Sequence, residues 1–468
     1  MARPGAAPSG IPFETLEHRG TMSVGDPAES VLRRLRLARS GPAADPTSGA
    51  APAVRGLPAD APSSAHVLAT FTAALLGAVL PVLMVVANKS APATVAVAAL
   101  AANAAALLAG RGGALGTRYR ALLGAPQTLL ATGVVALLAL SFAWTIDPRL
   151  TGRGLVEGIP ELVSALALAA AWPLVGGARD ARWLIGGIVA AGLLILFEHL
   201  LGMPIHALVR ARGEAWDLKR SAVPPLLLLW PAVALCWRAR RFGTVAVLAA
   251  AVVVGVAASH SGAPAAALAL GAALFALALA APRAALGLTG AALVVLIVSA
   301  PWTGSILSRA LPPDATRTLR EEHAEHRLAI WTAFEHRGFD RPWLGHGFDA
   351  SYKVAEVARP DGTPVPTDSS RILGFHPHDV LLQFWVELGA LGLAAASVVL
   401  CFVTARLAGR RGVALASRLG LLVGVLGVGL VGLSAWQPWW LASIAAALLW
   451  FDRADPHDDA ARRGPPRS

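Results

Sequence analysis

Charged residues are scarce in this sequence. Asp, Glu, Lys and Arg make up 15% of its 468 residues, whereas a soluble globular domain carries about 25%. Hydrophobic residues make up 55% of the chain, and the mean hydropathy is +0.59. This composition excludes an ordinary soluble protein and indicates a chain that is largely embedded in a membrane.

Cysteine and lysine are also rare. Cys236 and Cys401 both lie in or beside apolar segments, which excludes a disulfide scaffold and a cysteine zinc site, so we interpret them as packing residues. The lysines are Lys89, Lys219 and Lys353, so the net charge of +11 comes almost entirely from arginine. Whether that charge points to nucleic acid depends on its distribution along the chain.

The first 65 residues lack an apolar run, although they are rich in Pro, Gly, Ala and Ser. A secretory signal peptide needs about 7–15 consecutive apolar residues, so this segment is not predicted to be one. We expect 1–66 to be a disordered cytoplasmic tail, and 452–468 to be a second cytoplasmic tail.

The rest of the chain contains about twelve apolar segments of a length that can cross a bilayer. They are expected at 67–88, 91–110, 123–145, 159–176, 183–202, 222–237, 243–259, 262–281, 284–302, 380–405, 415–434 and 436–451. Backbone groups in lipid must be satisfied within each segment. The sequence therefore predicts an all-α integral membrane protein with membrane domains at 67–302 and 380–451. Pro224, Pro225 and Pro231 predict an irregular start for the sixth span.

Arginine is concentrated in the loops on one side of the predicted membrane topology. With both termini in the cytoplasm, the short inner loops hold most of the cations between spans: Arg111, Arg118, Arg120, Arg179, Arg182, Arg238, Arg240, Arg241, Arg283, Arg406, Arg410, Arg411 and Arg418. The positive-inside rule fits this orientation. The basic charge is thus explained by topology in a bacterial inner membrane, and no nucleic-acid partner is predicted. The outer cluster Arg210, Arg212, Lys219 and Arg220 is the exception.

One hydrophilic segment, 303–378, is too long for a simple connection between spans nine and ten. It contains half of the 12 histidines, and Arg317 to Phe334 has the apolar spacing of a helix. Long loops with such patterning are usually functional. We expect residues 303–379 to form a large, partly helical periplasmic cap.

Several motifs within and beside this segment resemble those of the O-antigen ligase family. His376-Pro377-His378-Asp379 precedes Glu387-Leu388-Gly389-Ala390-Leu391-Gly392. Upstream lie Arg327-Leu328-Ala329-Ile330-Trp331 and Pro342-Trp343-Leu344-Gly345-His346-Gly347-Phe348, and earlier Asp217-Leu218-Lys219-Arg220-Ser221-Ala222. The resemblance covers roughly 215–395.

The resemblance implies a membrane glycosyltransferase that takes a glycan from undecaprenyl diphosphate on the periplasmic side. A ligase transfers it to lipid A-core, and a related polymerase transfers it to a second lipid-linked glycan. No metal or cofactor is implied. Many family members carry a Ser-Arg pair after the seventh span, but this chain has Ser259-His260-Ser261 there. Candidates for a replacing cation are Arg210, Arg212 and Lys219.

The chemistry suggests a role for each candidate. An acceptor hydroxyl needs a base near neutral pH, and His378 suits this role, with His376 as its competitor. The leaving diphosphate needs fixed positive charge, for which Arg220 and Arg327 are candidates. Alternatively, Arg220 is an interfacial residue that extends to the headgroups, and Arg327 pairs with Glu322 or Glu325.

Asp379, Gln383 and Glu387 fall at helical spacing and line one face of the tenth span. An acid as deep as Glu387 is costly, so it either orients the site or pairs with an arginine. We expect Asp379, Glu387, Trp331 and His376 to support the site. Glu198-His199 is a weaker candidate pair. His323-x-x-His326 and His376-x-His378 lack the spacing of strong zinc signatures.

Two other classes of function remain open. A polysaccharide transporter or flippase would show internal repeats and paired broken helices near the middle of the membrane, and the sequence shows neither. A membrane sensor with a periplasmic domain would not need arginines beside a His-Asp helix start.

The orientation can be tested with reporter fusions. We expect an alkaline phosphatase fusion at Gly362 to be active and a reporter that functions only in the cytoplasm to be silent there, because the arginine bias places this loop outside. The opposite pair of results would overturn both the topology and the site.

Overall fold

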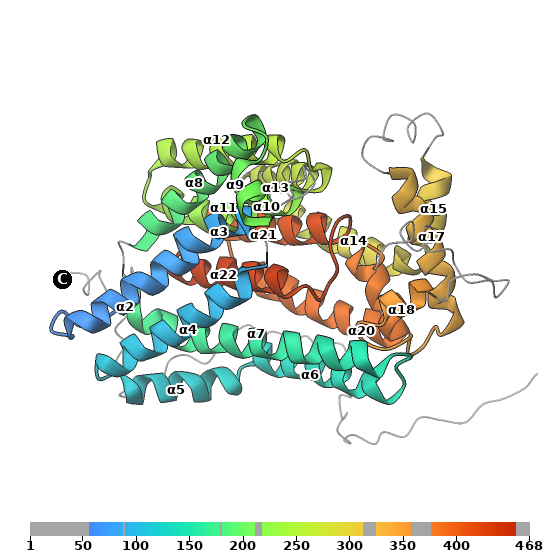
Figure 1. The fold of residues 1–468 in the computed structure, drawn as a ribbon, viewed down its shortest axis with the longest axis horizontal. Helices are drawn as coiled ribbons and strands as arrows, with labels where there is room; N and C mark the ends of the chain where they lie inside the picture. The colour runs from blue at the N-terminus through green and yellow to red at the C-terminus, as the bar shows by residue number, and fades with distance from the viewer. Residues whose placement is uncertain are drawn as a thin grey trace, which may run out of the picture. The chain divides into compact units, whose positions relative to one another are not determined.

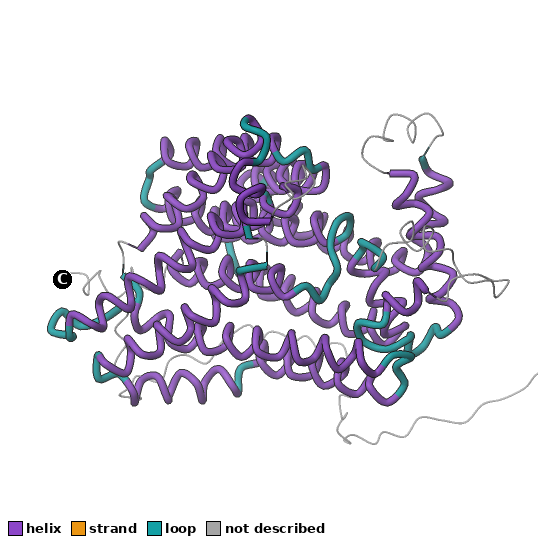
Figure 2. The backbone as a smooth tube through the Cα atoms, in the orientation of Figure 1, coloured by secondary structure: helices purple, strands orange, loops and turns teal. Residues whose placement is uncertain are grey.

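The computed structural model describes residues 56–87, 89–177, 180–210, 218–311, 324–356 and 376–454. These described residues form helices and loops without a strand (Figure 2). They belong to one compact unit, Val54–Ser468, whose helices are labelled in Figure 1.

The first half of the unit contains α2 (Ser63–Ala74), η1 (Leu75–Val79), α3 (Leu80–Val86), α4 (Ala91–Leu108), α5 (Gly112–Leu123), α6 (Pro126–Leu140), η2 (Ser141–Ala143), α7 (Pro148–Val175), α8 (Ala181–Leu200), α9 (Pro204–Arg210), α10 (Leu218–Ser221) and α11 (Val223–Arg238). The second half contains α12 (Phe242–Ala258), α13 (Gly262–Ala280), α14 (Pro282–Ser299), η5 (Ala300–Trp302), α15 (Thr303–Ala310), α17 (Ala324–Asp340), α18 (Ser351–Glu356), α20 (Val380–Ala408), α21 (Gly412–Gly429) and α22 (Pro438–Ala454).

The prediction of an all-α integral membrane protein is confirmed. Ten helices in the described parts are long and apolar enough to cross a membrane. The apolar helix α12 and the helix α22 are shorter, at 17 residues each. Each of the apolar segments expected from the sequence coincides with a helix of the structure.

Helix α11 lies at the centre of the bundle. In its membrane-length segment, Leu218–Arg238, 83% of the most apolar window is buried. It contacts α8, α12, α21 and α22. Trp230 fits among these helices because Gly271 and Gly420 leave room for its indole, and a Cβ atom on Gly420 would lie 2.3 Å from the ring. The prolines predict an irregular start, and the chain has one at Ala222, between α10 and α11.

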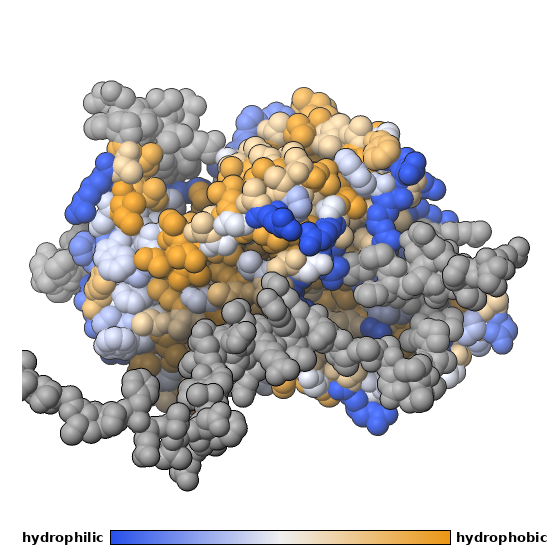
Figure 3. Space-filling model, turned by 180° about the vertical axis from the view of Figure 1, so that it is seen from behind, coloured by the Kyte–Doolittle hydropathy of each residue, from blue (hydrophilic) through white to orange (hydrophobic). Residues whose placement is uncertain are grey.

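Helix α6 is far less buried than α11, since only 11% of the most apolar window of its segment is buried. Large hydrophobic side chains are exposed on many helices, including Leu100 at 73% and Leu129 at 59%. On the face drawn in Figure 3, hydrophobic side chains cover much of the surface that the described residues form. Such a surface suits lipid and not water.

Arginines bind the carbonyl groups at the C-terminal end of α7. Arg118 of α5 donates from Nε to the carbonyl of Ala170 at 2.8 Å. Arg453 of α22 donates to the carbonyls of Trp172 and Gly176 at 2.6 and 3.1 Å. Cations are favourable there because the helix dipole is negative at its C-terminal end. Arg118 belongs to the inner loops that predict the cytoplasmic side, and Arg453 to the tail expected on the same side.

Two elements differ from the sequence-based expectation. Helix α5 occupies a segment taken as loop, because its charged and polar residues hide it from a search for apolar runs. Helix α7 begins at Pro148 and not near 159, since Asp147 caps it through Oδ1 and its first turns carry Arg149, Arg153 and Glu157.

The tryptophans before the last span also differ from the expectation. From the sequence alone, Trp436, Trp439 and Trp440, at the expected outer boundary before the last span, predict a tryptophan belt at the membrane interface. In the structure Trp439 and Trp440 are buried, with exposed fractions of 4% and 3%, and they belong to the main hydrophobic core. The belt interpretation is therefore wrong for these two residues.

The long segment after the ninth span contains α15, α17 and α18, which agrees with a partly helical loop. Helix α17 contacts α15, α18 and α20, and these elements lie together at one end of α20 in Figure 1. The expected helix at Arg317 to Phe334 is described only from Ala324 onward. Residues 312–323 and 357–375 lie outside the described part of the chain.

Candidate active site

The N-terminal end of α20 places His376, His378 and Asp379 together. Asp379 is the N-cap, and its Oδ1 accepts hydrogen bonds from the amides of Leu381 and Leu382 at 2.8 and 3.1 Å. A carboxylate at this position satisfies amides that have no partner within the helix. The preceding residue, His378, has a left-handed backbone with φ +56°, which turns the chain sharply into the helix.

The two imidazoles lie against each other, with ring centroids 4.1 Å apart. The amide of His378 donates to Nδ1 of His376 at 3.2 Å, so this nitrogen of His376 carries the lone pair. Nδ1 of His378 lies 3.3 Å from the carbonyl oxygen of Gly432. Because a carbonyl can only accept, this contact places the proton of a neutral His378 on Nδ1 and the lone pair on Nε2.

Arg220 belongs to the same cluster, although it is far from the histidines in sequence. Burial, together with the smaller effects of the positive charges of His378 and Arg220, lowers the pKa of His376 to about 3. His376 is therefore neutral at physiological pH. Arg220 lies on the short helix α10, which is fixed by a hydrogen bond of 2.8 Å from the hydroxyl of Ser221 to the carbonyl of Val85.

Arg327 and Trp331 lie on α17, one turn apart. Trp331 is 8% exposed and packs with Ile330 and Phe334 against α20, where Leu382 is one of the contacting residues. Trp331 thus positions α17 on α20. The side chain of Arg327 is half-buried. Its suggested partners, Glu322 and the side chain of Glu325, lie outside the described part of the structure.

Helix α20 is broken at Gly389, and the loop from Pro342 to Gly347 fills the break. Gly389 has φ +61° and ψ −152°, a conformation available almost only to glycine. The amide of Gly347 donates to the carbonyl of Glu387 at 2.8 Å, and the amide of Ala390 donates to the carbonyl of Pro342 at 2.8 Å. The two family-like motifs at 342–348 and 387–392 therefore form one structural unit.

The carboxylate of Glu387 holds this unit together. Its Oε1 accepts from the hydroxyl of Ser351 at 2.5 Å and from Nε2 of Gln383 at 2.9 Å. Its Oε2 accepts from the amide of Asp349 at 2.9 Å and from Nε1 of Trp436 at 2.6 Å. All four donors are neutral, so Glu387 orients the loop and α20 without an arginine among these hydrogen-bond donors.

The sequence reasoning did not identify Asp349 and did not predict that Trp436 binds Glu387. Burial and the nearby carboxylates of Glu387 and Glu157 raise the pKa of Asp349 to about 8, so its carboxyl is protonated at neutral pH. The ring of Trp436 packs on Phe348 with a centroid distance of 4.9 Å. Asp349 has φ +58°, which hydropathy and spacing cannot reveal.

Glu198 has a different partner from the one expected. Its Oε2 lies 2.6 Å from Nδ1 of His206, and both side chains are buried. The ring of His199 instead packs on His260 at 4.7 Å. His260 occupies the place where the family-like pattern has an arginine. Lys219 is half-buried on α10, whereas Arg212 and the side chain of Arg210 lie outside the described residues.

Comparison with known proteins identifies a related family. Residues 226–397 match the model of the O-antigen ligase family. This part of the chain is similar to the O-antigen ligase family. The matched region contains the kink of α20 at Gly389, the loop at 342–348 and both histidines, whereas Arg220 lies just before it.

Named relatives match a shorter stretch. "Putative polysaccharide ligase RP358" of Rickettsia prowazekii is 32% identical over 126 residues, which cover 26% of this chain and 30% of that relative. A protein of the same description from Rickettsia felis is 29% identical over 159 residues, which cover 32% of this chain and 38% of the relative. The chain thus spans about a third of the length of these relatives.

The break in α20 gives a test of the unit formed by the two motifs. We expect Gly389→Ala to lower the free energy of unfolding by about 2 kcal/mol or more, because the residue is left-handed and a Cβ atom would lie 2.5 Å from the backbone of Trp343. Thermal unfolding of the purified protein in detergent measures the change.

Gly409, at the other end of α20, is the matched control. A Cβ atom there meets nothing within 4 Å, so Gly409→Ala should change the free energy of unfolding by no more than about 0.5 kcal/mol. Equal stability of the two variants would contradict the tight fit of the loop into the break.

Proposed function

We propose that this protein is an O-antigen ligase-like glycosyltransferase that moves a glycan from undecaprenyl diphosphate to a periplasmic acceptor such as lipid A-core. The observation that carries the proposal is the cluster of Arg220, His376 and His378 at the start of α20. It combines a cation, a neutral imidazole and a second imidazole whose tautomer is fixed. The family match and the relatives named as polysaccharide ligases support it.

The proposed reaction is a displacement at the anomeric carbon. The acceptor hydroxyl forms the new C–O bond while the bond from this carbon to the diphosphate breaks. Nε2 of His378 takes the hydroxyl proton, and the diphosphate leaves with its negative charge stabilised by the guanidinium of Arg220. His376 holds the backbone of His378, and Asp379 caps the helix that presents it.

No metal ion is needed in this scheme, since the side chains supply both the base and the positive charge. A repeat-unit polymerase of the same family would use the same residues with a second lipid-linked glycan as acceptor. Deletion of the gene separates the two: a ligase is needed for attachment to lipid A-core, and a polymerase is needed for chain length.

Arg220 provides the first test of the proposal. We expect Arg220→Ala to lower transfer by roughly 100-fold, the effect of removing one preorganised charge donor from a transition state. Arg220→Lys should recover only part of the activity, because an ammonium cannot form two parallel bonds to phosphate oxygens. Transfer is measured with purified protein, lipid-linked donor and acceptor.

The matched control for this test is Arg149→Ala. Arg149 is exposed at the start of α7 and is expected on the same side of the membrane, so its loss should leave transfer nearly unchanged. Full activity of Arg220→Ala would remove Arg220 from the site.

The two histidines provide the second test. We expect His378→Ala to lower transfer by roughly 100-fold or more, and His376→Ala to lower it less, because His376 only positions its neighbour. A base acts in its neutral form, so wild-type activity should rise with pH between about 5.5 and 8.5. His376 stays neutral over this range, since its pKa is lowered to about 3.

The pH profile also distinguishes the two roles open to His378. If protonated His378 binds the diphosphate, activity falls with increasing pH, which would refute the role as base. If His376→Ala is inactive while His378→Ala is active, the assignment of the two histidines is wrong.

A further inference from the structure

Exposed aromatic rings gather beside the break in α20. Trp302 follows α14 and is 47% exposed, and Phe339, in the last turn of α17, is 42% exposed. Trp343, in the loop that fills the break, is 76% exposed. The ring of Phe339 contacts the rings of Trp302 and of the buried Trp385 at centroid distances of 6.0 and 5.3 Å. We call Trp302, Phe339, Trp343 and the neighbouring Leu344, which is 45% exposed, the aromatic edge.

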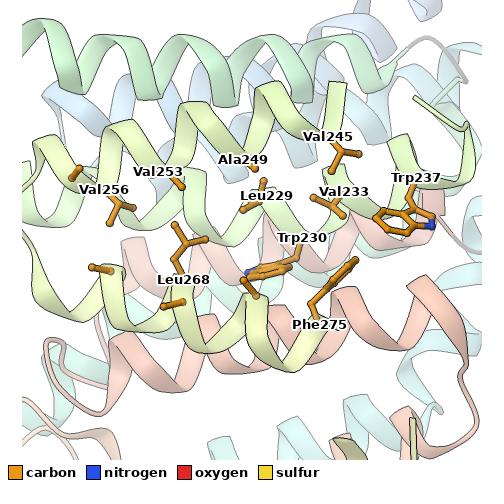
Figure 4. A pocket seen from close by; sticks show the side chains of 14 residues that line it. Leu229, Trp230, Val233, Trp237, Val245, Ala249, Val253, Val256, Leu268 and Phe275 are labelled. Carbon is orange, nitrogen blue, oxygen red and sulfur yellow. The ribbon is translucent and has the colours of Figure 1, made fainter. Parts of the chain in front are cut away.

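Exposure distinguishes these rings from tryptophans that pack within the bundle. Figure 4 shows Trp230 and Phe275 among the apolar side chains between α11, α12 and α13. Trp230 is only 3% exposed, and its ring packs on Phe275 at a centroid distance of 6.0 Å. The rings of Trp302 and Trp343 instead face the surroundings of the protein.

Charged side chains next to the aromatic edge exclude hydrocarbon at this level. Asp340 and Arg341 are exposed, and Asp340 pairs with Arg337 at 3.1 Å. An exposed carboxylate or guanidinium is costly in the hydrocarbon of a bilayer. Irregular backbone, such as the loop from Pro342 to Gly347, is tolerated there only where protein or water surrounds it. Because this loop fills the break in α20, the break lies at the membrane boundary or outside it.

The lengths of the helices agree with this position of the boundary. The whole of α20 has 29 residues and corresponds to roughly 44 Å, whereas its part after the break, residues 390–408, corresponds to roughly 28 Å. The hydrocarbon core of a bilayer is about 30 Å thick. Helices α14 and α21, which contact α20, have 18 residues each, so the part after the break matches its neighbours in length.

Two further spans end near the aromatic edge. The segment Pro126–Ala143 is followed by Trp144, whose Nε1 donates to the carbonyl of Leu344 at 2.8 Å. The carbonyl of Trp144 accepts from Arg341 at 3.3 Å. Helix α14 ends at Ser299, and η5, which follows it, contacts α17 and α20. The aromatic edge is therefore continuous with the ends of helices whose apolar sides face lipid.

We propose that the aromatic edge anchors the protein in the headgroup interface of the bilayer, and that α20 crosses the hydrocarbon only with residues 390–408. Tryptophan is favoured at this interface, and Arg341 beside it can extend to lipid phosphates. The first part of α20, with His378 and Asp379, then lies outside the hydrocarbon, and the tenth span begins later than the range 380–405 expected from apolar residues alone. The anchor does not depend on the proposed glycan transfer.

The two possible spans place different residues at the middle of the bilayer. If residues 390–408 cross the membrane, Val398 lies near the midplane and Leu391 lies about 10 Å nearer the boundary. If residues 380–405 cross it, Leu391 lies near the midplane and Val398 lies about 8 Å beyond it. Both side chains are exposed, Val398 at 56% and Leu391 at 42%, so a label at either position reaches lipid.

Spin labelling measures the depth of each position in the full-length protein, in bilayers of phosphatidylethanolamine and phosphatidylglycerol. Cys236→Ala and Cys401→Ala remove the native thiols. One nitroxide is then attached at one of four exposed positions: Arg149→Cys, Trp343→Cys, Leu391→Cys or Val398→Cys. Power saturation compares the contact of the nitroxide with oxygen, which concentrates in hydrocarbon, and with a water-soluble nickel complex. Leu344→Cys takes the place of Trp343→Cys if that variant does not fold.

We expect the ratio of oxygen contact to nickel contact to increase in the order Arg149, Trp343, Leu391 and Val398, with Val398 about 10 Å deeper than Leu391. Arg149 is the control in water, since it is a charged, exposed residue at the start of α7. A label that is deeper at Leu391 than at Val398 would overturn the shortened span. A label at Trp343 that is as accessible to nickel as the label at Arg149 would show that the aromatic edge faces water, and would overturn the anchor.

Discussion

The break in α20 is the constraint on which the candidate site depends. If α20 were continuous, the loop from Pro342 to Gly347 would lose its hydrogen-bond partners. The loop donates hydrogen bonds to, and accepts them from, backbone groups that only the break exposes. Those groups lie within a spanning helix, where an unsatisfied amide or carbonyl is costly. The loop satisfies them, and the carboxylate of Glu387 fixes the loop through Asp349 and Ser351. The helix between Glu387 and the N-cap is continuous, so fixing Glu387 also fixes the position of the N-terminus of α20 and of His378 before it.

A second constraint sets the position of Arg220, which comes from a distant part of the sequence. Helix α11 is almost wholly buried, so its position is set by neighbours on several sides. A single turn residue, Ala222, separates α10 from α11, and the hydroxyl of Ser221 on α10 donates to the carbonyl of Val85. Arg220 therefore lies on a short helix that is held at Ser221 and by the buried helix α11 that follows, which suits a residue whose charge must have one direction.

The sequence predicted the spans well because the apolar runs that create them are local and long. It could not predict α5, a helix of low hydrophobicity that packs on α7 and whose Arg118 binds the end of α7. It also could not predict the burial of Trp439 and Trp440, which depends on neighbours far along the chain. Motif spacing brought out His378 and Arg220 as separate candidates, and the structure places both near His376.

The hydrogen-bond partners of Glu387 could not be predicted from the sequence pattern. Depth along the helix predicts that the acid must be satisfied, and four neutral donors satisfy it. Which donors do so depends on Asp349, Ser351 and Trp436, and these come from a loop, from the start of α18 and from the connection after α21. No periodicity in the sequence relates these segments to one another.

The choice of neutral donors has an electrostatic consequence for the site. Asp379 is bound by amides of α20, and Glu387 is bound by hydroxyl, amide and indole groups, so neither carboxylate draws an arginine to itself through these bonds. Burial first, and then the charges of His378 and Arg220, lower the pKa of His376. An anionic diphosphate is the kind of group that the positive charge of Arg220 attracts. Asp379 and Glu387 thus order the backbone of the site through amide, hydroxyl and indole donors, while the proposed chemistry relies on the charge of Arg220.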